Sequence, residues 1–199
     1  LILGSASLEL LRQSGESLAG RVTYVSMSPF HPLEVPEPSF QVGRLWLRGG
    51  FPDSFLSDSD AASAEWRKNF VRTYLERDIP QFGPRIATET MERLWTMLAH
   101  RQGCPLNAAE LARALDSDTR VVGQYIDLLC DLLLVRRLRP FVPNLGKRLT
   151  KAHKIYIRDS GVTHYLLGLR SMDDLLGHPV VGLSWEGFVI ESVLQLIPW

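Results

Sequence analysis

Apolar residues recur at every third or fourth position over much of this 199-residue chain, a spacing that predicts amphipathic helices. Asp60 can cap one such helix, which we expect to run to about Asp78 and to end at Pro80. A second helix begins near Thr88 and stops at Gly103. Their apolar stripes are Trp66, Phe70, Val71, Tyr74 and Leu75 in the first helix and Met91, Leu94, Trp95 and Leu98 in the second.

The segment that follows has the pattern of a helix-turn-helix. Asn107, with Glu110 three residues later, resembles a capping box and predicts a short helix. After a tight turn, Ser117 or Asp118 can cap a longer helix that runs through Leu132. A helix, a short capped helix, a turn and a longer helix follow one another in the order of a helix-turn-helix.

Two short apolar segments, residues 134–138 and 154–157, predict strands that lie beside each other. Together they would form the wing of a winged helix. Further on, Asp159 can cap a short helix that ends at Gly168. Ser184 can cap a last helix, which carries on one side Trp185, Phe188, Val189 and Val193.

The chain opens on an apolar run, residues 1–3, that breaks into small and hydroxyl residues including Ser5. A buried strand that ends on hydroxyl residues places polar groups at the carboxyl edge of a parallel sheet, where α/β proteins hold nucleotides. Residues 22–25 predict a second strand. Because the chain has no initiator methionine, we interpret it as a piece of a longer protein and residues 1–35 as the remnant of a parallel-sheet domain.

Proline and glycine are dense between Pro29 and Pro52, which disfavours a regular helix and indicates a connection between two folded parts. We therefore place a linker at residues 36–58. Within it, residues 45–47 predict a short extended piece. The turn that follows is expected to direct Phe51 at a neighbouring core.

Positive and negative charges balance, with 22 Lys plus Arg and 22 Asp plus Glu, so no global field favours nucleic acid or a membrane. The distribution is uneven, because no acidic residue lies between Asp131 and Asp159. The basic residues of that stretch are Arg136, Arg137, Arg139, Lys147, Arg148, Lys151, Lys154 and Arg158. They predict either a local basic surface or a solvated wing and loop.

Two cysteines and five scattered histidines lack the spacing of a zinc site, so we expect a reduced, metal-free protein. Glu186 and Glu191 lie five residues apart on one predicted helix and do not share a face, so we expect both to face solvent. No apolar run approaches the roughly 20 residues of a spanning helix. We therefore expect no membrane contact and a cytoplasmic location.

If the winged helix binds DNA, its second helix lies in the major groove. The side chains that would face the base edges are Thr119, Arg120 and Gln124. Arginine and glutamine can each bind a base through two hydrogen bonds, and Arg136 and Arg137 would neutralise phosphates. The alternative is a protein–protein or interdomain module, which the acidic residues around this helix favour.

An ordered set of segments resembles AAA-type ATP-binding proteins that carry a carboxyl-terminal domain of unknown function. The segments are LILGSASLELL, SLAGR, SPFHPLEV, LWLRGGFPDSF, YLERDIP, VVGQYIDLL, KIYIRDSG and SWEGFVIE. By this resemblance Ser5 occupies the sensor-1 position and Arg21 the arginine of the SLAGR turn, both near the nucleotide. Residues 59–150 would form a helical, winged-helix domain, and residues 151–199 would begin a domain similar to PD-(D/E)xK nucleases, with Glu186 on its first helix.

The resemblance implies that the full-length parent binds ATP and Mg²⁺ through a GxxxxGKS/T loop, which these 199 residues do not contain. The metal-binding Asp and Glu-x-Lys of the nuclease fold are not present either. We therefore expect that this chain alone holds no cofactor, hydrolyses no ATP and cleaves no DNA. The expected fold class is mixed α/β and α: a parallel-sheet remnant, a winged helix and the start of a nuclease-like domain.

Three hypotheses of function remain open. In the first, the chain is part of an ATP-dependent switch in which the winged helix passes the nucleotide state to a DNA or protein partner. In the second, it is a winged-helix DNA-binding regulator without ATPase activity. In the third, it is a scaffold that binds only protein, either another protein or further copies of itself.

Overall fold

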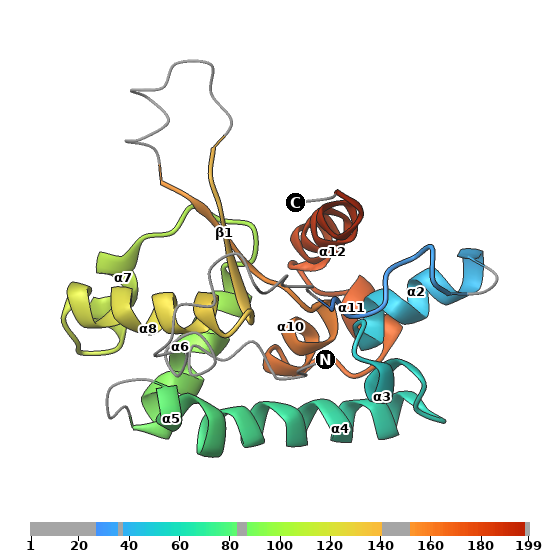
Figure 1. Cartoon of the computed structure of the whole chain (residues 1–199), viewed down its shortest axis with the longest axis horizontal. Helices are drawn as coiled ribbons and strands as arrows, with labels where there is room; N and C mark the ends of the chain where they lie inside the picture. The colour runs from blue at the N-terminus through green and yellow to red at the C-terminus, as the bar shows by residue number, and fades with distance from the viewer. Residues whose placement is uncertain (1–26, 36–37, 83–86, 141–151, 198–199) are drawn as a thin grey trace, which may run out of the picture.

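The computed structural model describes residues 27–35, 38–82, 87–140 and 152–197, and this part of the chain is mostly helical with a small antiparallel sheet (Figure 1). The described residues contain no parallel sheet, and the strands predicted at residues 1–3 and 22–25 lie outside them. In chain order the elements are α2 (Pro38–Arg48), α3 (Pro52–Phe55), α4 (Asp60–Thr73), the π-helical turn η1 (Tyr74–Asp78), α5 (Ile79–Phe82), α6 (Thr88–His100), α7 (Ala108–Ala114), α8 (Thr119–Asp131), β1 (Val135–Leu138), β2 (Lys154–Ile157), α10 (Ser160–Leu166), α11 (Met172–Leu176) and α12 (Val181–Leu196).

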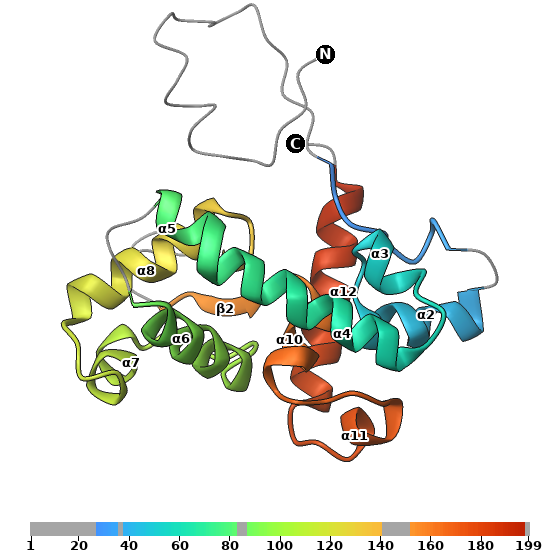
Figure 2. The same cartoon turned by 90° about the horizontal axis from the view of Figure 1, so that it is seen from below.

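Helix α4 runs along one side of the molecule and joins its two ends (Figure 1). In both views α6, α7 and α8 gather at one end, while α2, α3 and α11 gather at the other (Figure 2). The hairpin of β1 and β2 lies beside α6 and α8, and α12 lies between the hairpin and the second group. The larger hydrophobic core belongs to the first group and includes Trp95, Leu111, Ile126 and Ile155.

The prediction of an extended piece at residues 45–47 is wrong, because these residues lie in α2. Pro38 is the first residue of this helix, where its missing N–H would have had no partner in any case. The helix ends at Arg48, and the next residue, Gly49, has a φ of 80°, in the left-handed region that favours glycine. The segment 36–58, predicted as a linker, therefore contains two helices.

The expected end of the first long helix at Pro80 is also wrong. The chain stays helical through Pro80 to the end of α5, by way of the wider turn η1 directly before it. In that turn the N–H of Ile79 donates to the carbonyl of Tyr74, five residues back. A proline inside a regular helix clashes with the carbonyl four residues earlier, and a wide turn before it relieves that conflict.

The predicted caps of α7, α8 and α10 are confirmed. The side chain of Asn107 accepts from the N–H of Glu110, and that of Asp118 from the N–H of Arg120. Asp159 caps α10 by accepting from the N–H of Val162 at 2.8 Å. These bonds join residues two or three positions apart, which is why the sequence pattern predicts them.

The predicted pairing of residues 134–138 with 154–157 is confirmed as an antiparallel hairpin in which Val135 faces Ile157 and Leu138 faces Lys154. A bridge between Pro105 and Lys154 extends the pairing on the other side of β2. The sequence analysis placed a domain boundary after residue 150, between the winged-helix domain and the nuclease-like domain. The hairpin crosses this boundary, because β1 precedes it and β2 follows it.

A buried polar network joins α2, α10 and α12, and it explains why the predicted cap Ser184 is not a cap. Helix α12 begins at Val181, and Ser184 lies inside it. The ring of His164 donates to the carbonyl of Leu47 at 3.0 Å and accepts from the hydroxyl of Ser184 at 2.7 Å. The same hydroxyl accepts from the indole N–H of Trp46 at 3.0 Å. The neutral imidazole thus satisfies both of its ring nitrogens.

We expect this network to make the protein less stable in mild acid. Burial lowers the pKa of His164 to about 4, against an ordinary value of 6.5, and nearby Arg67 and His178 add to the shift. Below pH 6.5 the unfolded chain therefore takes up a proton that the folded protein refuses, so stability is complete above pH 6.5 and falls as the pH drops towards 4. Between pH 7 and 5.5 the loss from this group is about 1 kcal/mol.

Urea unfolding at pH 7 and 5.5 measures this effect when the native chain is compared with His164→Gln. Burial raises the pKa of Asp159, which stabilises the fold in acid and acts against the histidine. Asp159 is present in both proteins, so the difference between them in the pH dependence of the free energy of unfolding is due to His164. An equal pH dependence in the two proteins would contradict the assignment.

Candidate functional site: the outer face of α8 and its connection to α12

Helix α8 presents the three side chains predicted to face a partner. Thr119, Arg120 and Gln124 are exposed, while Val122 and Ile126 are buried on the opposite side of the helix. The inward residues pack into the core shared with α6 and α7. The outer face of α8 is therefore rigidly held and open to solvent, as a contact helix requires.

The two arginines predicted to neutralise phosphates are both engaged within the chain. Arg137 forms an ion pair with Asp127 of α8, and its guanidinium lies against the carbonyl of Gly123. Arg136 forms an ion pair with Glu191 of α12, and one of its bonds measures 2.9 Å. Among the described residues, Arg120 has no carboxylate partner for its side chain. The outer face of α8 and the hairpin therefore carry less free positive charge than the sequence predicts.

The expectation that Glu191 faces solvent is wrong. Only 4% of the residue is exposed, and its carboxylate lies between the guanidinium groups of Arg136 and Arg158. Arg158 donates to it at 3.1 Å. A carboxylate this deeply buried is stable only when paired, and here the two cations come from the strand β1 and from the residue directly after β2.

A second polar contact joins α12 to the hairpin. Glu186 accepts from Lys154 at 2.7 Å and from the hydroxyl of Tyr156 at 2.5 Å, so it is not free in solvent either. These two bonds lower the pKa of Glu186, and the bond from the ammonium group is the larger cause. Burial, with the carboxylate as the second cause, raises the pKa of Tyr156 to about 12. Helix α12 is therefore bound to the hairpin at two points along its length.

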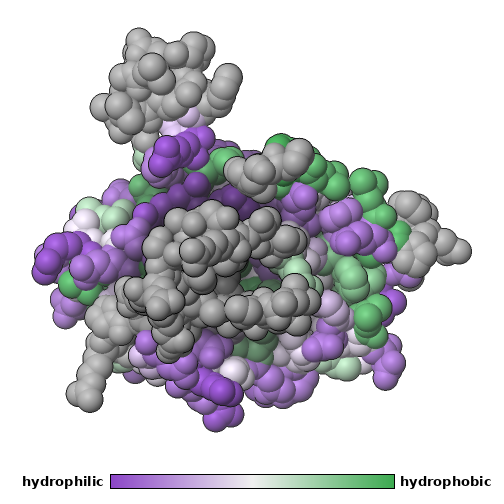
Figure 3. All heavy atoms as spheres, in the orientation of Figure 1, coloured by the Kyte–Doolittle hydropathy of each residue, from purple (hydrophilic) through white to green (hydrophobic). Residues whose placement is uncertain are grey.

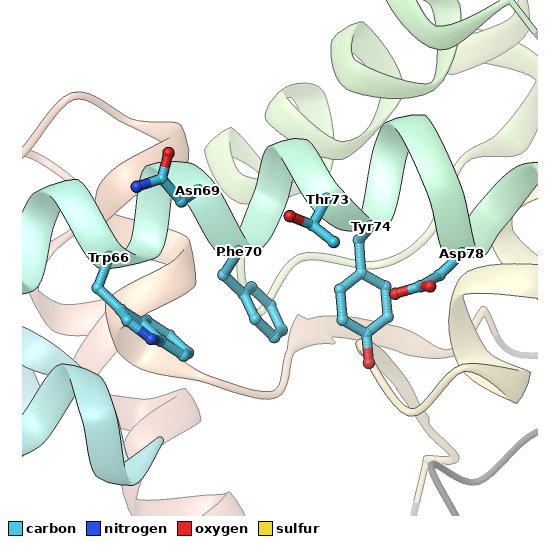
Figure 4. Close-up of a pocket in the computed structure, with 6 residues that line it drawn as sticks. All are labelled: Trp66, Asn69, Phe70, Thr73, Tyr74 and Asp78. Carbon is cyan, nitrogen blue, oxygen red and sulfur yellow. The ribbon is translucent and has the colours of Figure 1, made fainter.

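A small pocket of about 250 Å³ opens on α4, and no site was predicted there (Figure 4). Its lining residues are Trp66, Asn69, Phe70, Thr73, Tyr74 and Asp78. Phe51 packs on Trp66 and Phe70 with ring centroids 5.6 and 4.6 Å apart, which confirms its predicted inward direction. In the sequence these residues form an aromatic stripe beside Val71 and Leu75; Val71 and Leu75 are fully buried, while Phe70 and Tyr74 are only partly buried against the same core.

Neither of the two residues predicted to lie near a nucleotide can be placed, because Ser5 and Arg21 lie outside the described residues. In the described ranges, no group of three or more His, Cys, Asp or Glu residues is arranged to hold a metal ion. Within the same ranges, no helix combines the length and the apolar character that a membrane span requires.

The described domain corresponds to a known family. The family called Domain of unknown function (DUF8612) matches residues 39–173, which is more than half of the chain, so the chain belongs to this family. The match begins in α2 and ends in α11, and it includes α8 and the hairpin.

Two uncharacterized mycobacterial proteins, one from Mycobacterium tuberculosis and one from Mycobacterium bovis, are similar to almost the whole chain. Each is 48% identical over 197 residues, which cover 99% of this chain and 44% of the relative. The chain thus spans less than half the length of the curated relatives that it matches. No solved structure matches it.

Proposed function

We propose that this chain is part of an AAA-type ATP-binding protein in which a winged-helix module passes the nucleotide state to a partner. In this proposal residues 1–35 are the remnant of the nucleotide-binding parallel sheet, with Ser5 and Arg21 near the nucleotide. The segments LILGSASLELL and SLAGR support it by resemblance. The longer protein would bind ATP and Mg²⁺, whereas residues 151–199 would begin its nuclease-like domain.

The observation that carries the winged-helix assignment is the order and packing of α6, α7, α8, β1 and β2. A short capped helix, a turn and a longer helix precede an antiparallel hairpin, and all share one core. Asp116 in the turn has a φ of 50°, in the left-handed region that Asn and Asp tolerate better than most residues. The outer face of α8 is then the contact surface for the partner.

Helix α12 supplies a mechanical connection between the module and the rest of the chain. Because Glu191 binds residues at both strands of the hairpin, a displacement of α12 would move both strands together. The buried Ser184 links the same helix to His164 of α10 and to Trp46 of α2. These contacts support a role in passing a conformational change to α8.

We favour a protein as the partner. Non-specific affinity for DNA depends on free Lys and Arg side chains, and Arg136 and Arg137 are neutralised by Glu191 and Asp127 of the same chain. The second candidate is DNA, and it is favoured by the exposure of Thr119, Arg120 and Gln124 on the first turns of α8. The salt dependence of binding distinguishes a DNA partner from a protein partner, because the logarithm of DNA affinity falls linearly with the logarithm of salt concentration.

On the DNA hypothesis, we expect Arg120→Ala to lower the affinity for duplex DNA about tenfold, since one arginine contact to a base is worth roughly 1–3 kcal/mol. Fluorescence anisotropy with a labelled duplex at two salt concentrations measures it. Arg170→Ala is the matched control, because Arg170 is exposed but lies outside the module. Equal affinity of all three proteins, with a flat salt response, would exclude α8 as a DNA-contacting helix.

The ATPase part of the proposal has its own test. The coding sequence upstream of residue 1 should contain a GxxxxGKS/T segment within about 150 residues, the length of one domain. The chain of 199 residues by itself should show no ATP hydrolysis and no DNA cleavage in steady-state assays. Turnover by this purified chain, or an upstream sequence without the phosphate loop, would refute the proposal.

A further inference from the structure

The exposed face of α12 and the pocket on α4 differ in how far their chemistry specifies a ligand. Hydrophobic residues gather over α12 in the space-filling view (Figure 3), and its exposed large side chains include Trp185, Val189 and Val193. None of the exposed positions from residue 181 to 197 is charged, so nothing on this face selects one class of partner. The pocket on α4 combines aromatic rings with one carboxylate, and that combination favours a cation.

A continuous row of aromatic rings forms the apolar part of the pocket. Trp66, Phe70 and Tyr74 follow one another at four-residue spacing and therefore share one face of α4 and η1. The ring centroids of Trp66 and Phe70 are 5.2 Å apart with their planes at 20°, and those of Phe70 and Tyr74 are 4.7 Å apart. Phe51, directly before α3, packs on Phe70 and holds the row in place. All these rings are partly exposed, so a cation can reach the negative faces of their π-systems.

The carboxylate of Asp78 lies at one end of this aromatic row. Asp78 is the last residue of η1, one turn beyond Tyr74, and Figure 4 shows the two side chains next to each other on the same side of the helix. Burial raises the pKa of Tyr74, and the negative charge of Asp78 is the second cause. Turns of the π-helical kind occur often at functional sites. A cation at this end of the row would lie against an aromatic ring and beside a negative charge at once.

The side chains that line the pocket carry one negative charge and no positive charge. The cations in the middle of α4 are paired elsewhere, Lys68 with Glu65 at 3.1 Å and Arg72 with Glu76 at 2.8 Å. Lys68, Arg72 and Glu76 each come two positions after an aromatic residue of the row, which places them on the opposite side of the helix. The pocket therefore complements a positively charged group.

The size and chemistry of the pocket suit an arginine side chain. Its volume of about 250 Å³ is below the roughly 300–1,000 Å³ of pockets that hold drug-sized ligands, so it can take one side chain but not a larger molecule. A guanidinium group is planar, lies flat on an aromatic ring and can donate two parallel hydrogen bonds to one carboxylate, whereas a lysine ammonium is a strongly hydrated point charge. Free arginine also carries an α-carboxylate, for which the lining offers no cation. An arginine within a peptide chain therefore fits better.

From these observations we infer that the pocket on α4 binds an arginine side chain of a partner protein. The guanidinium group lies against the rings of Phe70 and Tyr74 and donates to the carboxylate of Asp78. A contact of this kind selects the partner more than it adds affinity. The inference goes beyond the proposed function, which concerns the outer face of α8, and the binding requires no nucleotide.

Titration of the isotope-labelled full chain with N-acetyl-L-arginine amide, followed by NMR, tests this inference. We expect saturable shifts of the amide signals of Asn69, Thr73 and Asp78, with a dissociation constant in the millimolar range because a single side chain makes few contacts. N-acetyl-L-citrulline amide is the matched control probe, since it has nearly the same shape without the charge. It should bind about tenfold more weakly, because it loses both the cation–π contact and the charge-assisted hydrogen bonds.

Two variants complete the experiment. Asp78→Asn should weaken binding of the arginine probe about fivefold. Glu76→Gln is the matched control variant and should leave the affinity unchanged, because Glu76 is exposed and lies outside the pocket.

Equal affinities for the two probes, no saturable shift, or an unchanged affinity in Asp78→Asn would overturn the inference. The comparison of the two probes uses the native chain, so it holds whether or not the variant folds. Tighter binding of free L-arginine than of the blocked probe would overturn the inference as well and would assign the pocket to a free amino acid. An upstream sequence without a phosphate loop would refute the ATPase proposal and leave these affinities unchanged.

Discussion

Replacing Glu191 with alanine is expected to destabilise the protein by about 3 kcal/mol, because the change leaves Arg136 and Arg158 beside a buried site without a counter-charge. Both guanidinium groups are partly exposed and can turn towards water. The expected loss of stability is therefore at the low end of the range of about 3–5 kcal/mol for removing one partner of a buried ion pair. Urea unfolding measures the free energy. Hydrogen exchange should also show faster exchange in β1 and β2, since α12 no longer binds them.

Glu186→Ala is the matched control for this prediction. Glu186 lies on the same helix and also binds the hairpin, but 38% of its side chain is exposed, so its loss should cost at most about 1 kcal/mol. A double-mutant cycle with Arg136→Ala gives the coupling energy directly. Strictly additive effects of Arg136→Ala and Glu191→Ala would show that the ion pair does not join α12 to the hairpin.

Gly161→Ala is expected to be at least as damaging, with a loss of about 3 kcal/mol or more. A Cβ atom on Gly161 would lie 2.7 Å from the backbone nitrogen of Gly49 and closer still to the carbonyl of Arg48. These atoms belong to the backbone at the end of α2 and cannot move aside. The methyl group would therefore push α10 away from α2 and break the bonds that Arg67 donates to the carbonyls of Leu47 and Gly161.

Gly123→Ala provides the control for the glycine substitution. Gly123 also lies in a helix, but nothing would lie within 4 Å of its new Cβ atom. Since alanine favours a helix over glycine by roughly 0.5–1 kcal/mol, this change should stabilise the protein slightly. Urea unfolding gives the midpoint of each variant. If the dependence of the free energy on urea concentration is unchanged, a shifted midpoint reports a change in stability. If the two alanine variants are equally stable, α10 and α2 do not touch at Gly161.

These two positions also bear on the proposed function. Gly161 holds α10 on α2, and Glu191 holds α12 on the hairpin, which the ion pair of Arg137 with Asp127 joins to α8. If the proposed function holds, these contacts would carry a conformational change between α2 and the hairpin.

The elements predicted correctly depend on contacts that are short in sequence. Asn107, Asp118 and Asp159 cap helices through bonds to N–H groups two or three residues away, and their residue types are sufficient to indicate this. The strands of the hairpin were predicted from two short segments with apolar residues at several positions, and these segments pair with each other as expected. The outward direction of Thr119, Arg120 and Gln124 follows from the helical period.

The predictions that failed depend on contacts between distant residues. The proline-rich segment before Gly49 is helical because Leu45, Trp46 and Leu47 bury themselves against residues far along the chain. Ser184 was predicted as a cap from its type alone, but a buried histidine 20 residues earlier binds it inside the helix. Both errors arose because tertiary packing outweighs local preference.

The amino-acid pattern by itself determined the helical stripes and the caps of α7, α8 and α10, since each of these is decided within one or two turns of chain, whereas the predicted caps Asp60 and Ser184 are wrong because Ser59 caps α4 and α12 begins at Val181. Only the tertiary structure decided that Glu191 is buried, because its partner Arg136 lies 55 residues away and no spacing rule connects them. The same holds for α12 as a whole, whose buried residues include the polar Ser184 and Glu191. A polar face turns inwards only when its hydrogen-bonding and charged partners are already in place, and these come from α2, α10 and the hairpin.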